Sequence, residues 1–165
     1  MRYSQFAALS SEMLMSYKQD LYRAMQEGRN PLTEKYAYMM EFTDPDYFDR
    51  ELRKRLPAVS PQKGDLVDRI ANILIGCEQK FAAAYPALAG RSRPLLGSEA
   101  GNVSFHLYTI GELKTYSEET LRLYYDYLQV LDMEDENVNP SFVIHRNTVM
   151  FYGYDSLEDA ERKLR

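Results

Sequence analysis

The sequence predicts an all-α protein, folded as a single compact domain over residues 1–165 with about seven helices and one long ordered loop. Three observations predict this class. Apolar residues recur every three or four positions along most of the chain, which is the spacing of one helix face. Capping residues, several of them followed by proline, stand where these patterns begin. The alternation of polar and apolar residues that indicates a strand is scarcely visible.

The first helix is expected to run from about Phe6 to near Gly28, because apolar side chains form one stripe through this segment. The stripe consists of Phe6, Leu9, Met13, Tyr17, Leu21 and Met25. A second helix should begin after Asn30, an N-cap that is followed by Pro31 at the first helical position, where the missing N–H costs nothing. We expect it to end at about Phe42.

A short, strongly charged third helix is predicted from Thr43-Asp44-Pro45, which repeats the start signal, to Leu56-Pro57. The clearest helix of the chain starts at Ser60-Pro61 and ends before Pro86. Its apolar face contains Leu66, Ile70, Ile73, Leu74, Cys77, Phe81 and Ala84. We expect this to be the central packing helix.

Periodicity is lost between Ala87 and Val103, where the chain carries Gly90, Pro94, Gly97 and Gly101. This composition predicts a long ordered loop, a kind of segment that often carries function. The helices expected after it are a short one from about Ser104 to Lys114, one capped by Ser117, one beginning at Pro140 and one capped by Ser156.

Composition narrows the classes of partner and site. The net charge is −5, from 20 Lys and Arg against 25 Asp and Glu, so the basic footprint of a nucleic-acid-binding protein is missing and nucleic acid is not an expected partner. Cys77 is the only cysteine, and neither His106 nor His145 has a second histidine or cysteine at a ligand spacing. We therefore expect no disulfide, no metal site and no cofactor.

The longest aliphatic run, Ile73-Leu74-Ile75, is far too short to span a bilayer, and the first residues lack the apolar core of a signal peptide. The expected protein is therefore cytoplasmic, with no membrane association. A single cysteine fits a reducing compartment.

The candidate site lies between Gly90 and Ser117, because polar and conformationally special residues concentrate there. Arg91 and Arg93 could present two guanidinium forks to a carboxylate or phosphate. The alternative is that these arginines hold the loop by bonding to backbone carbonyls or to Glu99 and Glu112.

A second part of this candidate site follows a glycine at the junction of two expected helices. Glu112, Lys114, Tyr116 and Ser117 stand there, where the free N–H groups of the next helix could help to cradle an anion. Ordinary local structure is the alternative, with Ser117 a cap and Lys114 and Glu112 either solvated or paired to the two arginines. His106 lies nearby as an acid or base, or as a partly exposed polar residue.

Other chemistry-bearing residues are expected to be structural. Cys77 lies on an apolar stripe and should be a small buried hydrophobe. His145 should be a hydrogen-bonded core or interface residue, and the acidic run 132–136 a solvated turn. Tyrosine is frequent, at 14 residues, and suits either a polar-tipped pocket or a protein interface; for Tyr124 and Tyr152 core packing is expected.

Four blocks of this sequence resemble a bacterial family, domain of unknown function family 4125. They are Glu34–Glu41, Leu88–Pro94, Gly111–Ser117 and Asn147–Tyr154, and the resemblance covers essentially the whole chain. It implies no reaction, cofactor or partner. Members of that family usually carry a further N-terminal segment before the block that matches residues 1–6, which leaves open whether part of a family site lies outside this chain.

The leading hypothesis is a helical binding domain in which loop 90–101 and junction 111–117 form one polar pocket for a small anionic metabolite. The residues expected to bind this ligand are Arg91, Arg93, Glu99, His106, Glu112, Lys114 and Tyr116. The alternative is a tyrosine-rich interaction module that docks a partner or forms a homodimer and binds no ligand. An enzyme ranks third, because no nucleophile-base pair, metal set or phosphate loop can be assigned from spacing, and no catalytic residue is named.

Overall fold

The computed structural model describes residues 2–99 and 102–165, and all of their side chains except those of residues 2, 98, 99 and 102. The helices are α1 (Arg2–Phe6), α2 (Ser11–Gln26), α3 (Pro31–Thr43), α4 (Pro45–Tyr47), the π-helix η1 (Phe48–Leu52), the 3-10 helix η2 (Arg53–Arg55), α5 (Pro61–Ala84), α6 (Pro86–Ala89), α7 (Phe105–Leu113), α8 (Glu118–Val130), α9 (Pro140–Phe151) and α10 (Leu157–Leu164). The all-α class is confirmed.

Side-chain caps place the helix starts where the sequence predicts them. Asn30, Ser60, Ser104, Ser117, Asn139 and Ser156 each accept a hydrogen bond from a backbone N–H in the first turn of the helix that follows. Each cap satisfies an N–H group that has no partner within the helix. These local bonds explain why sequence reasoning located the helix starts well.

Three segments differ from the prediction. The first helix is interrupted, because the Ser10 side chain accepts a hydrogen bond from Met13 N and starts α2 separately from α1. Leu9 still packs against the core at this break, so the apolar stripe continues across it and conceals it. The expected third helix is divided among α4, η1 and η2, and the expected loop contains α6 and a short hairpin.

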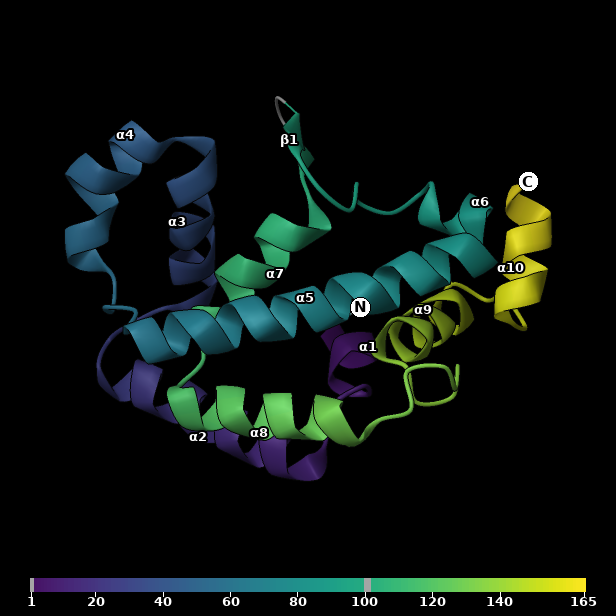
Figure 1. Cartoon of the computed structure of the whole chain (residues 1–165), viewed down its shortest axis with the longest axis horizontal. Coiled ribbons are helices and arrows are strands. Elements are labelled where there is room, and N and C mark those ends of the chain that lie inside the picture. Colours follow the sequence, from purple (N-terminus) through teal and green to yellow (C-terminus); the bar gives the residue numbers. More distant parts are fainter. Residues whose placement is uncertain (1, 100–101) are drawn as a thin grey trace.

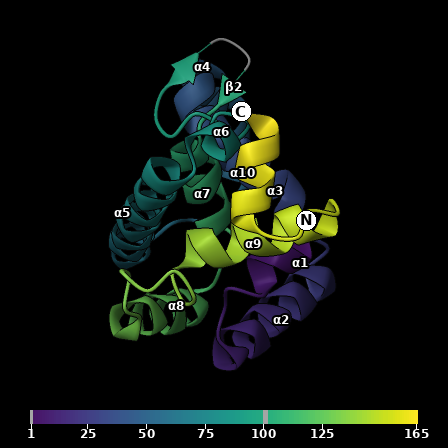
Figure 2. The same ribbon diagram turned by 90° about the vertical axis from the view of Figure 1, so that its right-hand side faces the viewer.

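That hairpin pairs β1 (Ser98–Glu99) with β2 (Asn102–Val103) in antiparallel register, with Ser98 opposite Val103. It projects from the end of the molecule that faces away from α2 and α8 (Figure 2). The long segment after α6 is therefore partly folded on itself. Among the described residues, β1 and β2 are the only strands, and each has two residues.

Helix α5 crosses the middle of the molecule, with α2 and α8 along one side, α3 and α7 near one end and α6, α9 and α10 near the other (Figure 1). One buried cluster joins α2, α5, α7 and α8 and contains Met13, Tyr17, Val67, Ile70, Ala71, Leu74, Ile110, Leu113, Tyr116, Leu121, Tyr124 and Leu128. A second contains Phe81, Tyr85, Leu88, Phe142, Val149, Leu157 and Ala160. The expectation that α5 is the central packing helix is confirmed.

Close contact between α3 and α7 depends on Gly111. A Cβ atom at this position would stand 2.6 Å from Met39 Cγ and 2.9 Å from the backbone oxygen of Lys35. Both distances are shorter than real Cβ contacts, so only glycine lets the two helices approach this far. The contact fixes the position of α3 against α7, and these two helices carry much of the candidate site.

No helix within residues 2–99 and 102–165 combines the length and the apolar character that crossing a bilayer requires.

Candidate functional site

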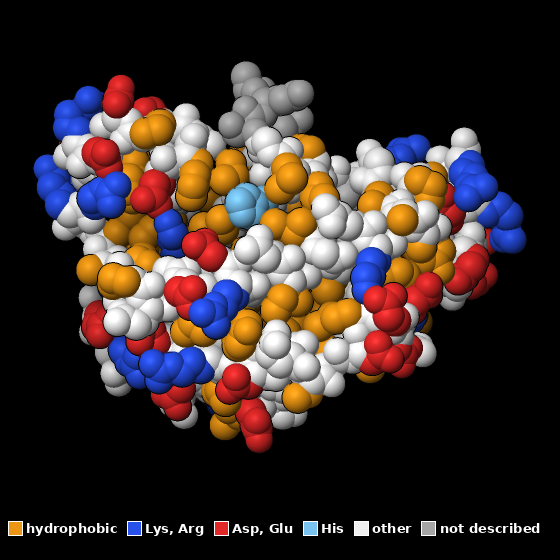
Figure 3. Space-filling view, viewed as in Figure 1, with side chains coloured by type: hydrophobic (Ala, Val, Ile, Leu, Met, Phe, Trp, Pro, Cys, Tyr) orange, Lys and Arg blue, Asp and Glu red, His pale blue; other side chains and the backbone are white. Residues whose placement is uncertain are grey.

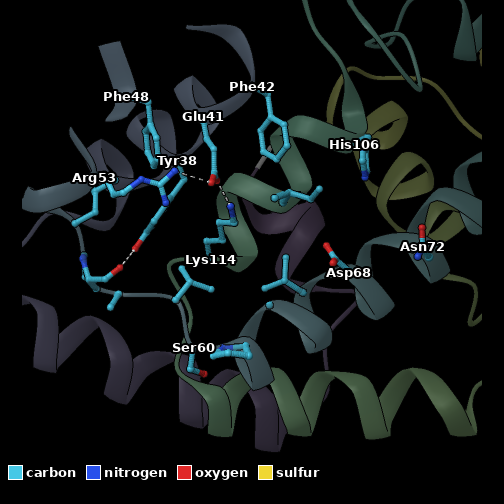
Figure 4. A pocket seen from close by; sticks show the side chains of 18 residues that line it. Tyr38, Glu41, Phe42, Phe48, Arg53, Ser60, Asp68, Asn72, His106 and Lys114 are labelled. Carbon is cyan, nitrogen blue, oxygen red and sulfur yellow. Dashed lines mark hydrogen bonds and ion pairs between the residues drawn. The ribbon is translucent and has the colours of Figure 1, made fainter. Parts of the chain in front are cut away.

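A pocket of about 970 Å³ lies between α3, the segment 45–60, the first half of α5 and α7 (Figure 4). This volume is in the range that small-molecule sites occupy. The space-filling view shows apolar side chains exposed between the charged residues at the α3–α4 end and the middle of the molecule (Figure 3). Besides aliphatic and small residues, the lining contains three groups of side chains: aromatic rings, a set of ion-paired residues, and a set of polar residues without ion pairs in the described part of the chain.

The aromatic group consists of Tyr38 and Phe42 from α3 and Phe48 from η1. Tyr38 Oη donates a hydrogen bond to the backbone oxygen of Pro57 at 2.6 Å, which ties the segment before α5 to α3. Burial raises the pKa of Tyr38 to about 12, so its phenol remains a donor at neutral pH. Phe42 is 44% exposed and offers its ring at the edge of the pocket.

The charged group is a chain of three side chains, in which Glu41 lies between Lys114 and Arg53 (Figure 4). Lys114 Nζ pairs with Glu41 Oε2, and Arg53 Nη2 stands 3.6 Å from Glu41 Oε1. The Lys114 ammonium also lies 5.3 Å from the centroid of the Phe42 ring, within the range of a cation–π contact. Lys114 is thereby held at the pocket with only 14% of its side chain exposed.

The third group faces this chain from α5 and α7 and consists of Asp68, Asn72 and His106 (Figure 4). Among the described residues, none of these three side chains has a hydrogen-bonding or ion-pair partner. Asp68 and Asn72 stand one helical turn apart on α5, and His106 is half-buried in the first turn of α7. These groups are therefore free to contact a bound molecule.

The other predicted site residues whose side chains are described do not line this pocket. Glu112 pairs with Lys35, a lysine that is only 1% exposed and whose ammonium lies 3.1 Å from the centroid of the Tyr108 ring. Arg93 also lies over this ring, at 4.7 Å, and donates a hydrogen bond to the backbone oxygen of Val103 at 3.3 Å. Arg93 thus makes the bond to a backbone carbonyl that the alternative interpretation anticipated, whereas Glu112 pairs with Lys35 and not with the loop arginines.

Arg91 is exposed and lines neither of the two cavities described here. Tyr116 is buried, with its ring centroid 4.8 Å from that of Tyr17, and the side chain of Glu99 lies outside the described part of the chain. The structure therefore brings His106 and Lys114 to one pocket and leaves Arg91 and Arg93 away from it. A ligand-binding role for the two arginines stays a prediction.

A second, smaller cavity of about 90 Å³ adjoins the pocket, and Pro57 and Lys114 border both. Arg29 and Glu34 line it, with Arg29 Nη1 at 2.9 Å from both carboxylate oxygens of Glu34. Burial lowers the pKa of Arg29, but hydrogen bonds to Glu27 and Glu34 outweigh it and raise the pKa overall. The small cavity is therefore bordered by ion-paired side chains, whereas aromatic rings lie along one side of the main pocket.

Nearly all of the chain matches a known family. A family model with the description protein of unknown function (DUF4125) matches residues 1–162. The chain belongs to this family. No curated protein and no solved structure matches it.

The blocks that carry the resemblance to DUF4125 meet in the fold. Block Glu34–Glu41 lies on α3 and block Gly111–Ser117 joins α7 to α8, and they are linked by the pairs Lys35–Glu112 and Glu41–Lys114. The other two blocks meet in the second buried cluster, which holds Leu88 and Val149. The four blocks therefore form two tertiary contacts. The contact between α3 and the end of α7 forms one side of the pocket.

The remaining candidates have structural surroundings. Cys77 is 2% exposed, and burial raises the pKa of its thiol to about 11, so the expectation of a buried hydrophobe is confirmed. His145 Nε2 lies 2.9 Å from Glu78 Oε1 and its half-buried ring stacks on Phe81, so the expected hydrogen bond is confirmed and the residue lies at the edge of the core. The prediction that Tyr152 packs in the core is wrong, because this residue is 60% exposed at the end of α9.

Metal ligands do not gather in the described ranges, where no three His, Cys, Asp or Glu side chains are placed to hold an ion together.

Sequence reasoning missed most of the pocket. The polar and aromatic lining residues that it did not select include Tyr38, Glu41, Phe42, Phe48, Arg53, Asp68 and Asn72. It also missed Lys63, which lines the small cavity. One signal could have found this lysine: it stands four residues before Val67 and seven before Ile70, on the buried stripe of α5.

Proposed function

We propose that this protein binds a small anionic molecule with an aromatic or apolar body in the 970 Å³ pocket. One observation carries the proposal: the pocket places Lys114 and His106, two residues expected to bind a ligand, on either side of the exposed ring of Phe42. Pockets of this size that combine apolar surface with a few convergent polar groups are the usual form of a small-molecule site.

The two sides of the pocket would contact different parts of the ligand. Lys114 and Arg53 attract the carboxylate or phosphate of the ligand and exchange their contact with Glu41 for it. The ring of Phe42 packs against the body. Asp68 and Asn72 on the opposite side accept hydrogen bonds from a hydroxyl or amine of the ligand. The expected ligand therefore has an anionic group at one end and a hydrogen-bond donor at the other.

A thermal-shift screen of the purified protein tests this proposal, with aromatic carboxylates and phosphorylated aromatic compounds that carry a hydroxyl or amine. A ligand that binds only the folded state raises the melting temperature by mass action. Lys114→Ala should weaken its affinity by about tenfold or more, roughly 1.4 kcal/mol or greater, because a charge-assisted contact is lost.

Arg91→Ala is the matched control, because Arg91 is an exposed cation outside the pocket. Its affinity for the ligand should equal that of the wild type. A ligand whose binding depends on Arg91 and not on Lys114 would move the site to the loop. Preference for cationic compounds over the anionic set would also overturn the proposal.

Docking or homodimer formation is the second candidate, and exposed apolar side chains on α1 and α9 favour it. Tyr3 is 75% exposed on α1, and Met150, Phe151 and Tyr152 are 58%, 72% and 60% exposed at the end of α9, which packs against α1. Surface patches of this kind often mark protein contacts. Light scattering over a range of concentrations should show a dimer that Phe151→Ser weakens; a strict monomer at high concentration would remove this candidate.

A further inference from the structure

Lys63 is a largely buried lysine whose ammonium group has no hydrogen-bonding or ion-pair partner in the described part of the chain. It stands in the first turn of α5, on the same face as Val67 and Ile70, and its exposed fraction is 9%. Its backbone N–H donates to the Ser60 side chain, but among the described residues no hydrogen bond or ion pair involves Nζ. The side chain is largely buried, but Nζ itself is not sealed inside the protein, since no enclosed side-chain nitrogen or oxygen of the described residues lacks a hydrogen-bond partner. The ammonium therefore opens onto the adjoining space, and an acceptor placed there could reach it.

Lys63 lines the 90 Å³ cavity beside the α8 N-terminus. The two carboxylates that share the cavity are already engaged. Asp20 Oδ2 accepts from Ser117 N at 2.9 Å and from Thr120 Oγ1 at 2.7 Å, and both oxygens of Glu34 accept from Arg29. The N–H groups of the Lys63 ammonium thus face a cavity in which the carboxylates of Asp20 and Glu34 already accept hydrogen bonds from other residues.

Three further cations, Arg23, Arg29 and Lys114, line the same cavity, so basic groups outnumber Asp20 and Glu34 there by four to two. Arg29 and Lys114 are paired with Glu34 and Glu41, while Arg23 stands 3.9 Å from Asp20. Glu41 and Glu27, which pair with Lys114 and Arg29, balance this difference in charge. An added anion would therefore be held by the unpaired ammonium of Lys63 and the loosely held Arg23 rather than by a net positive charge.

The ionisation of Lys63 agrees with this geometry. Burial lowers its pKa, and the carboxylates of Asp20 and Glu118 oppose this effect without cancelling it. The surroundings therefore compensate the buried charge incompletely. An oxygen anion close to Nζ would supply the missing acceptor.

We propose that the cavity at Lys63 is a binding subsite for one small oxyanion, a phosphate or carboxylate group, with Lys63 Nζ as its principal donor. A space of about 90 Å³ admits such a group without a larger body. The subsite does not depend on the proposed function, because an inorganic anion is sufficient to fill it. Where the anion belongs to a larger ligand, the body of that ligand lies past Lys114 in the main pocket, since Lys114 borders both cavities.

Calorimetric titration with inorganic phosphate, at constant ionic strength, tests the subsite. The wild-type protein should bind one phosphate, and Lys63→Met should weaken this binding by about tenfold or more. Lys18→Met is the matched control, because Lys18 is an exposed lysine on α2 that does not line the cavity. Absence of binding to the wild type, or equal binding by Lys63→Met, would overturn the proposal.

A second measurement uses the unaltered protein and so does not depend on how the variant folds. Phosphate should protect Lys63 from an amine-acylating reagent, as read by mass spectrometry, while acylation of Lys18 stays unchanged. Equal acylation of Lys63 with and without phosphate would refute an anion at this amine.

Phenyl phosphate distinguishes a free anion from the head group of a larger ligand. Binding tighter than that of inorganic phosphate, with the gain lost in Phe42→Ala, assigns the anion to a molecule whose body lies in the main pocket. Equal affinities that both depend on Lys63 assign it to a free anion, and in that case the subsite stands while the proposed function of the main pocket loses its support.

Discussion

Replacement of Gly111 by alanine should reverse the usual effect of this substitution in a helix. Alanine normally stabilises a helix interior by about 1 kcal/mol relative to glycine. At Gly111 the new Cβ would meet Met39 Cγ at 2.6 Å and the Lys35 backbone oxygen at 2.9 Å. Met39 can rotate away, but the backbone of α3 must move, and such overpacking costs roughly 2–3 kcal/mol. The net expectation is a loss of about 1–2 kcal/mol, or roughly 2–8 °C in melting temperature.

Gly76→Ala is the matched control, because Gly76 also lies within a helix, α5, and an added Cβ there has no neighbour within 4 Å. This variant should gain about 1 kcal/mol in the free energy of unfolding. Thermal melts by circular dichroism and urea titrations of both variants measure the difference. A Gly111→Ala protein that is as stable as Gly76→Ala would refute the close approach of α3 and α7. One cooperative transition in these melts would also support the expected single domain, which stays a prediction.

Two further predictions each test a single contact. Glu112→Ala should lower the free energy of unfolding, measured by urea titration, by about 3 kcal/mol, because it leaves the buried Lys35 ammonium without its carboxylate. Adding Lys35→Met should restore most of this loss, and a loss below about 1 kcal/mol would contradict the pairing. Hydrogen bonds from Ser156 and from Tyr85, whose Oη lies 2.7 Å from the carboxylate, lower the pKa of Glu158 to about 2. Their stabilisation is present above pH 4.5, the ordinary pKa of this group, and is lost as the pH falls towards 2. Tyr85→Phe should therefore lose less stability between those pH values than the wild type, and identical pH profiles of the urea midpoint would count against the bond.

Local signals made most helix starts predictable. Ser60, Ser104 and Ser117 cap their helices with bonds to residues three positions later, so the sequence contains both partners of each interaction. The break at Ser10 was missed for the opposite reason. An apolar stripe continues through it, and packing of Leu9 against the core gives the same pattern as an unbroken helix.

The pocket was less predictable because its contacts join distant parts of the chain. Lys35 meets Glu112, and Glu41 meets Lys114, across more than 70 residues, and spacing within one helix carries no information about such pairs. The two arginines of the polar loop predicted an anion site there, but the Arg93 guanidinium lies over the ring of Tyr108 and holds the loop to α7. Short-range patterns therefore locate helices, while the site depends on how α3, α5 and α7 come together.

Helix α5 belongs to both buried clusters, with Val67, Ile70 and Leu74 in one and Phe81 in the other. At about 1.5 Å per residue its 24 residues extend roughly 36 Å, so it is one continuous rod through both packing units. Its central amides can exchange with solvent only when both units open, whereas those of α10 need only one to open. Hydrogen exchange along α5 therefore reports global unfolding, and an anion held at Lys63 in its first turn would slow that exchange even in amides next to the far cluster.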